Sequence, residues 1–354
     1  MRVRILEKID REQWDVRARS VPDATIFQTT IMADLVEKIR GMKALYLVAE
    51  DALGNICAQL LFFEGISGLI YQNDLSLLHR IYKRFHKNIF WHYGPLIFER
   101  DQYIPILSEI VRSIDEYAQK NAVHKIGEIL PPVHDYGLDQ EQIREVFEQH
   151  GFSARKSATV LIELHKGKEA LWNELKKSSR YDVSKAQRDG VEVVELMSKD
   201  EIAGFHRVRV ESAIRNATFI PRPKDIAVEI DVNPKRKIML AKIKGRVIAG
   251  YILRYFNGIV QQCALANSEY ARKKNIFAMH LLTWAGIQWG CEEGFRFFDF
   301  MGVNPLSEKR TPKEYGIYRF KTRWGGRELR YYSYTKAFPR RLRSLISVAT
   351  RIKW

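Results

Sequence analysis

Two short, strand-like apolar runs flank a glycine-containing turn at two places that lie far apart in the chain. The first place is Tyr46–Phe63, with its turn at Gly54, and the second is Ile238–Phe256, with its turn at Gly245. Apolar runs on both sides of such a turn are typical of a β-hairpin. We therefore predict one hairpin in each half of the chain.

Each hairpin is followed by the same order of elements: an apolar strand, a helix that ends at a polar or glycine break, and another strand. The ranges are Phe90–Phe98, Ile104–Ala122 and His124–Ile129 in the first copy, and Gly258–Ala266, Ala278–Gly294 and Phe295–Val303 in the second. Repetition on this scale predicts two duplicated domains that share a cleft, and clefts between domains are common substrate sites. Chance similarity between two such units is the alternative.

The domain boundary is predicted near residue 155, because the apolar strand Ala158–Leu164 can open the second copy. The chain then divides into an N-terminal subdomain 1–155, a C-terminal subdomain 156–335 and a basic tail 336–354. The 354 residues suffice for about two domains. In the tail, apolar and arginine side chains alternate at helical spacing. This suits an amphipathic helix at a membrane surface, or equally a helix docked on its own domain.

Composition indicates a soluble globular protein, with 46% hydrophobic and 28% charged residues. No apolar run approaches the ~20 residues that span a bilayer, and the N-terminus lacks the features of a secretory signal. The three cysteines are far apart and without metal-ligand spacing. We therefore expect a cytoplasmic protein, which the basic tail could bring to the inner face of the membrane.

The charge balance adds a further expectation about partners. The formal net charge is +16, which favours an anionic partner: nucleic acid, an anionic membrane surface or a phosphorylated substrate. General solubility would also explain such a balance. Motifs for other chemistries are absent: the sequence has no HExxH, CxxC, P-loop, GxGxxG or GxSxG. Metal, oxidoreductase, NTPase and serine hydrolase functions are therefore poorly supported.

The order of elements in each copy matches the acyl-CoA N-acyltransferase (GNAT) architecture, so the predicted fold class is α/β (α+β) with two tandem GNAT-like subdomains. That fold normally binds a pyrophosphate on a glycine-rich turn before its central helix, where backbone N–H groups can approach the phosphates. The equivalent turn here, starting at Ala271, carries Arg272, Lys273 and Lys274 but no glycine. Coenzyme A is therefore not expected as a cofactor.

Five segments together resemble a known family: Phe27–Met32, Gly94–Ile97, Leu171–Val193, Phe295–Val303 and Gly316–Gly326. The chain resembles the FemABX family, the aminoacyl-tRNA-dependent peptidyltransferases that add amino acids to peptidoglycan precursors. The resemblance covers roughly residues 10–335. Some members carry a long coiled-coil arm, but residues 171–240 have neither the length nor the heptads for one. The chain is thus similar to the smaller members without the arm.

The resemblance also implies roles for particular residues. The family's Phe-Lys pair before a Gly-Gly falls on Phe320 and Lys321, and its lysine is expected to stabilise the oxyanion as the acceptor amine attacks the aminoacyl ester. Asp299 could orient the amine or Lys321, or it could be a buried capping carboxylate. Candidates for binding the acceptor's phosphates and peptide are Gln28, Arg180, Lys185, Arg215, Arg222 and Tyr251.

Three functions remain open at this point. The first is an aminoacyltransferase with aminoacyl-tRNA as donor and a UDP- or lipid-linked muropeptide as acceptor, working as a monomer because one chain supplies both walls of the cleft. The second is an acyl-CoA-dependent N-acyltransferase acting on a sugar or amino-acid amine. The third is a non-enzymatic basic protein that binds RNA or membranes and keeps a degenerate acyltransferase fold.

Overall fold

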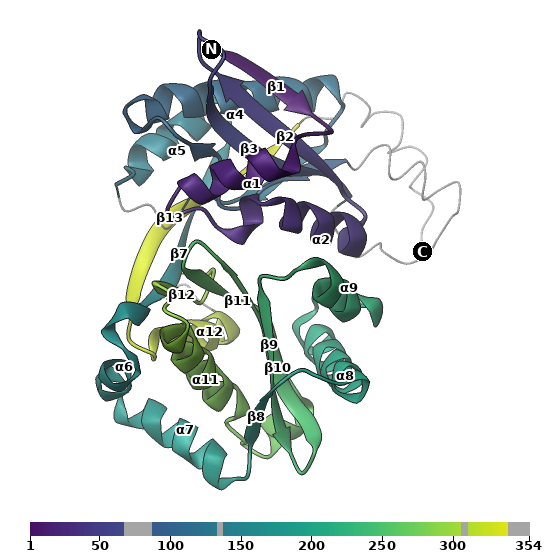
Figure 1. Cartoon of the computed structure of the whole chain (residues 1–354), viewed down its shortest axis with the longest axis vertical. Coiled ribbons are helices and arrows are strands. Elements are labelled where there is room, and N and C mark those ends of the chain that lie inside the picture. Colours follow the sequence, from purple (N-terminus) through teal and green to yellow (C-terminus); the bar gives the residue numbers. More distant parts are fainter. Residues whose placement is uncertain (67–86, 133–136, 306–310, 339–354) are drawn as a thin grey trace.

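The computed structural model describes residues 1–66, 87–132, 137–305 and 311–338. Of the predicted tail, residues 339–354 lie outside these described residues, so the expected amphipathic helix and its membrane contact stay predictions. Figure 1 shows the first half of the chain at the top and the second half below it.

The first half follows one order of elements from the N-terminus to the middle of the chain. Its helices and strands are β1 (Arg2–Leu6), α1 (Arg11–Ser20), α2 (Thr30–Arg40), β2 (Lys43–Glu50), β3 (Ile56–Gly65), β4 (Asn88–Phe90), β5 (Leu96–Ile97), α4 (Tyr103–Lys120), β6 (Lys125–Ile129), α5 (Gln140–Gln149) and β7 (Ser153–Glu163).

The second half repeats that order with two additional helices at its start and one before its central helix. Its elements are α6 (Lys168–Glu174), α7 (Lys177–Arg188), β8 (Glu192–Glu195), α8 (Lys199–Asn216), α9 (Lys224–Val232), β9 (Arg236–Ile243), β10 (Arg246–Phe256), β11 (Ile259–Asn267), α10 (Glu269–Lys273), α11 (Ala278–Glu292), β12 (Phe297–Asp299), α12 (Pro312–Thr322) and β13 (Arg327–Ala337).

Both predicted hairpins form, as β2–β3 and β9–β10. Gly54 has φ +86° in the first turn, and Lys244 and Gly245 have φ +46° and +76° in the second. Left-handed backbone of this kind is what tight hairpin turns require, which is why a glycine stands in each. The predicted strand Phe90–Phe98 is in fact two short strands, β4 and β5, separated by a turn in which Tyr93 has φ +56°.

The pairing of strands shows that the repeat is a true structural duplication. In the first half, β3 pairs with β4 antiparallel, and β4 pairs with β6 in parallel across helix α4. In the second half, β10 pairs with β11 antiparallel, and β11 pairs with β12 in parallel across helix α11. The edge strands correspond as well, because β1 pairs with β2 and β8 pairs with β9.

The two halves exchange their last strands. The final strand of the first half, β7, pairs with β12 of the second half, while the final strand of the chain, β13, pairs with β6 of the first half. Strands β7 and β13 also pair with each other along most of their length, and Figure 1 shows β13 running from the lower half to the upper one. One continuous 13-stranded sheet results in the described chain. The predicted boundary at residue 155 falls inside β7, so no simple cut separates the halves.

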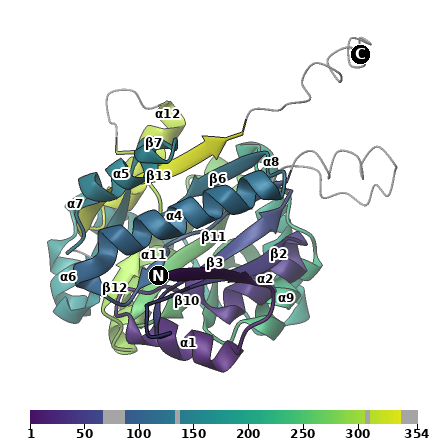
Figure 2. The ribbon, with the colours of Figure 1, turned by 90° about the horizontal axis from the view of Figure 1, so that it is seen from above.

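Alternation along β2 explains the layers of the first half. Leu45 and Leu47 pack with α4 and α5, whereas Tyr46 and Val48 pack on the opposite face with α1 and α2. Figure 2 shows α4 on one side of these strands and α1 on the other. The core on the α1–α2 face continues into the second half through Phe205 of α8 and other buried residues. The halves therefore share one of their hydrophobic cores.

Candidate active site

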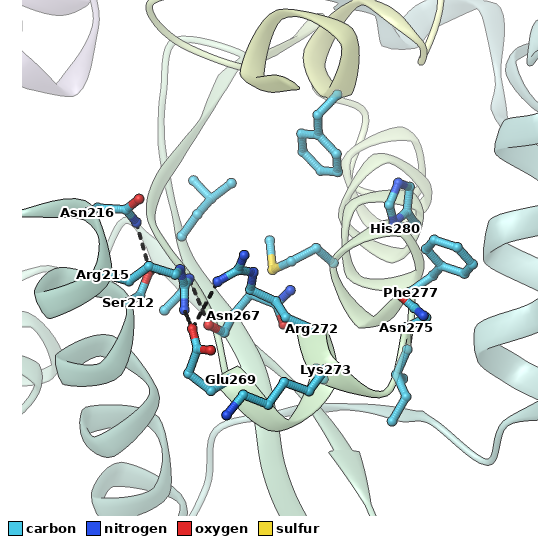
Figure 3. A pocket seen from close by; sticks show the side chains of 16 residues that line it. Ser212, Arg215, Asn216, Asn267, Glu269, Arg272, Lys273, Asn275, Phe277 and His280 are labelled. Atoms are coloured by element: carbon cyan, nitrogen blue, oxygen red, sulfur yellow. Dashed lines mark hydrogen bonds and ion pairs between the residues drawn. The ribbon is translucent and has the colours of Figure 1, made fainter. Parts of the chain in front are cut away.

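A cavity of about 840 Å³ opens in the second half between α8, β11 and the start of α11. We call it the second-half cavity. Figure 3 shows the side chains around it, which come from the end of α8, the end of β11, the turn that contains α10, the first turn of α11, and Phe320 of α12.

Cationic side chains dominate one wall of the second-half cavity. Arg215 donates to Glu269 Oε1 at 2.7 Å and to the carbonyl oxygen of Asn267 at 3.0 Å. Arg272 donates to the same carboxylate oxygen at 2.9 Å. The hydrogen bond from Arg215 holds the pKa of Glu269 below its ordinary value, so this carboxylate is charged at neutral pH. Lys273 lines the same cavity, so three cations stand against one carboxylate and this wall is positive.

The turn between β11 and α11 lies where the GNAT fold normally has glycines, and here it contains none. It folds as the short helix α10, and its backbone N–H groups donate to carbonyl oxygens within the turn at 2.9–3.2 Å. The N–H groups concerned are those of Arg272, Lys274, Asn275 and Ile276. These four amides are taken within the turn, whereas the first turn of α11, which begins at Ala278, has no side-chain cap at Phe277.

A neutral histidine lies at the aromatic end of this cavity. Arg323 can only donate, so Nε2 of His280 accepts its hydrogen bond at 2.7 Å and the ring proton sits on Nδ1. Burial, assisted by the charge of Arg323, lowers the pKa of His280 to about 4. Arg323 in turn pairs with Asp182 at 2.6 Å. The rings of Phe277 and Phe320 meet the imidazole edge to face, which gives the cavity an aromatic end.

Lys321 follows Phe320 on helix α12, and its ammonium group is held by backbone. Nζ donates to the carbonyl oxygens of Met301 at 3.1 Å and Gly302 at 2.7 Å. Burial lowers the pKa of Lys321 to about 8, although the nearby charge of Asp299 opposes this shift. At neutral pH the group is therefore charged but poorly hydrated, and such a cation interacts strongly with a developing negative charge.

Asp299 is fully buried at the end of β12 and acts as a capping carboxylate. Oδ1 accepts hydrogen bonds from the backbone N–H of Met301 at 2.7 Å and from the hydroxyl of Thr159. Oδ2 accepts from the amide of Gln261 at 3.2 Å. Of the two roles left open by the sequence, the geometry favours the capping one, with an electrostatic influence on Lys321 through the field of the carboxylate.

The Gly-Gly that follows the Phe-Lys pair turns the chain from α12 into β13. Gly325 and Gly326 have φ +79° and +81°, in the left-handed region that favours glycine. A Cβ atom on Gly326 would also collide with the carbonyl oxygen of Leu161 in β7. This close approach positions the end of α12, and with it Lys321, against the central strands.

A β-bulge in β11 lies next to these residues. One residue of β10 faces two residues of β11, Ala264 and Leu265, and Ala264 has φ +50°. A bulge leaves its extra residue out of the strand ladder and bends the strand locally. Leu265 lines the second-half cavity, whereas Ala264 lines a different cavity. The bulge therefore stands between two cavities.

That other cavity, which we call the inter-half cavity, has a volume of about 330 Å³ and lies between α2, β3 and β4 of the first half and α8, β10 and β11 of the second. A third, linking cavity of about 510 Å³ shares lining residues with both others. Met301, which holds Lys321, contacts Cys263 of the inter-half cavity at 3.5 Å between sulfur atoms. Phe320 lines the second-half cavity, whereas Lys321 lines neither this cavity nor the inter-half cavity.

Two of the six predicted binding residues are entirely buried. Gln28 donates from Nε2 to the carbonyl oxygen of His92 at 2.9 Å and accepts the backbone N–H of Leu61 at 2.8 Å. The hydroxyl of Tyr251 donates to the carbonyl oxygen of Leu282 at 2.6 Å. Neither side chain exposes any surface, and both contribute contacts within the core; their part in substrate binding stays a prediction.

Arg180 and Arg222 are used mainly within the protein. Arg180 donates to carbonyl oxygens at the end of α6, among them that of Leu175 at 2.8 Å. Arg222 pairs with Asp225 at 3.0 Å and donates to the carbonyl oxygen of Ile39 in α2, which ties the second half to the first. These contacts give the two arginines a structural role, and their part in binding the acceptor stays a prediction.

The last two predicted residues lie at or near the second-half cavity. Arg215 lines it directly. Lys185 pairs with Asp189 at 2.5 Å, and its ammonium group lies 5.6 Å from the ring centroid of Phe277, a residue of the cavity wall. The structure thus places Phe320 and Arg215 in the wall of one cavity. Lys185 lies against Phe277 of that wall, and Lys321 follows Phe320 in the chain.

Sequence reasoning missed two residues that the structure brings to the cavities, His280 and Arg209. His280 belongs to the first turn of α11, directly after the cationic turn, and this position was a signal that could have been used. Arg209 is one of several basic residues on α8, and nothing in its local pattern separates it from exposed neighbours.

Two searches of the described residues bear on metals and membranes. No group of three or more His, Cys, Asp or Glu side chains is arranged to hold a metal ion in the part of the chain that the structure describes. Among the same residues, no helix has both the length and the apolar character needed to cross a bilayer.

Comparison with known proteins gives matches only at the level of structure. No protein-family model and no curated protein sequence matches this chain. The structure is similar to a crystal structure of FemX, with a TM-score of 0.68 and 13% identity over 96% of this chain and 98% of that chain. It is also similar to L-PGS from Bacillus licheniformis, with a TM-score of 0.56 and 14% identity over 98% of this chain and 97% of that chain.

A third similar structure is a tandem GNAT protein from the clavulanic acid biosynthesis pathway, with a TM-score of 0.53 and 12% identity over 96% of this chain and all of that chain. At such identities the likeness shows a shared fold. It confirms the predicted α/β architecture of two tandem GNAT-like subdomains and, at the level of fold, the resemblance to FemX. Residues 171–240 form only α6–α9 and two strands, in keeping with the predicted lack of a coiled-coil arm.

Proposed function

We propose that this protein is an aminoacyltransferase that moves an amino acid from aminoacyl-tRNA to an amine of a UDP- or lipid-linked cell-wall peptide precursor. One observation carries the proposal: the β11 bulge stands between two cavities, and Phe320 lines one of them while the ammonium group of Lys321 is held by the backbone of Met301 and Gly302. A group-transfer enzyme needs a donor and an acceptor on two sides of one reacting centre. The fold shared with FemX supports this choice among transfer reactions.

The second-half cavity suits the 3′ end of a tRNA. Arg215, Arg272 and Lys273 offer cations for backbone phosphates, and the rings of Phe277 and Phe320 offer surfaces on which a base can stack. The turn before α11 contains no glycine, and four of its amides are bonded within the turn, which favours a donor other than coenzyme A. Aminoacyl-tRNA is therefore the preferred donor, and no cofactor is required.

In the proposed reaction the neutral amine of the acceptor attacks the ester carbonyl of the aminoacyl-tRNA. The carbonyl oxygen becomes an oxyanion, and the Lys321 ammonium stabilises it with the N–H that Met301 and Gly302 leave unused. The tetrahedral intermediate then expels the ribose oxygen. The proton lost by the amine ends on the ribose hydroxyl, so an amide and a free tRNA are formed.

Both walls of this site come from one chain, which supports a working monomer. A lipid-linked acceptor would place the enzyme at the inner face of the membrane, where the basic tail and the net charge of +16 would favour contact with anionic lipid. A UDP-linked acceptor would leave it in the cytoplasm.

A transfer assay tests the proposal. The full chain is mixed with labelled aminoacyl-tRNAs or with labelled acetyl-CoA, and with UDP-linked and lipid-linked muropeptides as acceptors. We expect RNase-sensitive transfer from tRNA. Lys321→Ala should lower kcat about 100-fold or more without weakening tRNA binding, since loss of one oxyanion donor costs about 10²–10³. Arg319→Ala, an exposed cation on the same helix, is the matched control and should keep activity.

The opposite results are equally clear. Transfer from acetyl-CoA alone would identify an ordinary acyl-CoA N-acyltransferase and contradict the tRNA assignment. RNA or membrane binding with no transfer from either donor would favour the non-enzymatic alternative. Full activity of Lys321→Ala would remove the proposed role of this lysine.

A further inference from the structure

We propose that Arg323 is a positioning residue for Lys321, because its guanidinium group ties the end of α12 to side chains of α7 and α11. We call this set of contacts the Arg323 clamp, and its members are Arg323, Ser179, Asp182 and His280. The catalytic meaning of the clamp rests on the proposed function, in which Lys321 stabilises the oxyanion. The environment that the clamp gives Lys321 can be measured without any transfer.

Helix α12 has little buried surface to hold it in place. None of its eleven residues is buried, and Tyr318 and Phe320 pack against the core of the second half while staying partly exposed. Thr311 caps its first turn, and Lys313 donates to a carbonyl oxygen at the end of α8 at 3.3 Å. Both contacts lie at the N-terminal end of the helix, whereas Lys321 lies in its last turn. Since helices in proteins are held mainly by packing of a buried face, the last turn depends on the contacts made there.

Arg323 supplies these contacts at the C-terminal end of α12. Nε donates to the hydroxyl of Ser179 at 3.0 Å, one terminal nitrogen pairs with Asp182 at 2.6 Å, and the other donates to Nε2 of His280 at 2.7 Å. The hydroxyl of Ser179 donates in return to the carbonyl oxygen of Arg323 at 3.0 Å. A guanidinium group is planar and its donors have fixed directions, so three partners determine both its place and its orientation.

The clamp is shielded from water, which strengthens its charged contacts. The side chains of Arg323, Asp182 and His280 are 20%, 13% and 15% exposed, and Ser179 is fully buried. Removing one partner from such a place leaves the other charge poorly solvated and unpaired. Burial lowers the pKa of His280 to about 4, so Nε2 keeps its lone pair for Arg323 throughout the neutral range. Helices α7 and α11 also pack on each other, which makes them a firm frame for the clamp.

The clamp acts on Lys321 through its position. Lys321 lies two residues before Arg323, and the two carbonyl oxygens that hold its ammonium group belong to the segment after β12. Their distances of 3.1 and 2.7 Å leave no room for a shift of about 1 Å, which would break the hydrogen bonds and admit water. Besides burial, only Asp299 and Cys263 act on the pKa of Lys321, so the charge of Arg323 is not a direct cause.

Competitive labelling of the full chain with acetic anhydride measures the environment of Lys321 directly. Mass spectrometry of the resulting peptides follows the labelling of this lysine as a function of pH, and in the natural protein its midpoint should lie near pH 8. In Arg323→Met the midpoint should rise by about one pH unit or more, towards the ordinary lysine value, because the ammonium group regains water. Arg319→Met removes an exposed cation of the same helix and should leave the midpoint unchanged.

A second pair of variants keeps the test independent of Arg323. Asp182→Ala removes one partner of the clamp and should raise the midpoint of Lys321 in the same direction. Asp182→Asn retains an oxygen that accepts from Arg323, so it should recover more than about half of this shift. Near-ultraviolet circular dichroism identifies the folded variants, and Asp182→Ala decides the question if Arg323→Met does not fold. An unchanged Lys321 midpoint in the folded variants would overturn the inference.

The transfer assay separates positioning from binding. Arg323→Lys keeps the charge but cannot hold three partners, so it should lower kcat about tenfold or more while KM for aminoacyl-tRNA changes by less than about twofold. A raised KM with unchanged kcat would instead make Arg323 a donor-binding residue and overturn the inference. A shifted Lys321 midpoint without transfer from any donor would contradict the proposed function alone. Transfer from tRNA with the midpoint unchanged in the variants would contradict this inference alone.

Discussion

Lys321 shows how a single residue acquires its chemistry from its surroundings. A lysine in water has three hydrated N–H donors, whereas this one gives two to backbone carbonyls and is half-buried. The loss of water lowers its pKa to about 8, and the buried carboxylate of Asp299 limits the shift. The group therefore stays protonated at neutral pH but titrates within the range of an ordinary assay.

Transfer activity should accordingly depend on pH in a defined direction. If the Lys321 cation stabilises the oxyanion, kcat should fall above about pH 8, as the group loses its proton. Lys321→Arg should move this fall to higher pH, because a guanidinium does not titrate there. A pH profile of kcat for both proteins measures the effect. A rate that instead rises through pH 8 would identify Lys321 as a base.

The same shift has a consequence for stability. Because the pKa of Lys321 is lower in the folded protein than in the unfolded chain, the unfolded state binds more protons between about pH 8 and the ordinary lysine pKa. The unfolding free energy should therefore rise with pH in this window as far as Lys321 contributes. Lys321→Met should lack this part of the rise in denaturant titrations.

At the scale of elements, helix α12 depends on its first turn. Thr311 caps the backbone N–H of Glu314, and the Glu314 carboxylate accepts the backbone N–H of Thr311 in return. Asn304 donates to the same carboxylate at 3.2 Å, which connects the helix start to the segment after β12. This helix carries Phe320 and Lys321 near its C-terminal end, so its position decides where the proposed catalytic pair lies.

Removing this cap should weaken both stability and catalysis. Thr311→Ala should lower the unfolding free energy by about 1 kcal/mol, because the capping hydrogen bond is lost. Thr311→Ser keeps the hydroxyl and should be close to the natural protein. Chemical denaturation measures the first effect and the transfer assay the second. Unchanged stability of Thr311→Ala would mean that other contacts hold the helix start.

Local patterns were sufficient for most individual elements but not for their ends or partners. Both hairpins and helices α4 and α11 follow from periodicity and turns in the sequence. Helix α9, which follows the proline-bracketed loop 219–223, was missed, since a nine-residue helix beside prolines has little periodicity to reveal it. The burial of Gln28 and Tyr251 could not be predicted for another reason: polar side chains look alike in sequence whether they lie at the surface or in the core.

At the scale of the whole molecule, the exchanged strands make the two halves depend on each other. Strand β13 comes from the end of the chain but pairs with β6 of the first half. Strand β7 comes from the end of the first half but pairs with β12 of the second. The shared core on the α1–α2 face adds to this coupling. A chain with such connections should unfold as one cooperative unit rather than as two domains.

Truncation tests this coupling. Removing residues 327–354 deletes β13 and should abolish the folded structure of both halves, because β6 and β7 lose their common neighbour. Removing only residues 339–354 leaves β13 intact and is the matched control, which should unfold in a single transition. Near-ultraviolet circular dichroism and tryptophan fluorescence follow Trp14 and Trp91 in one half and Trp284 and Trp324 in the other. Two separate transitions would contradict the predicted cooperativity.

The sequence by itself determined the repeated order of elements, the GNAT-like fold class and the absence of a glycine-rich turn, because these depend on residues that are close together in the chain. The basic character of the proposed donor site follows from the same local information, whereas the donor itself is what the resemblance to the FemABX family implies. Only the tertiary structure decided the exchange of β7 and β13, the position of the β11 bulge between two cavities, and the lowered pKa of Lys321. The physical reason is that desolvation and pairing depend on neighbours brought from distant parts of the chain, which local patterns do not record.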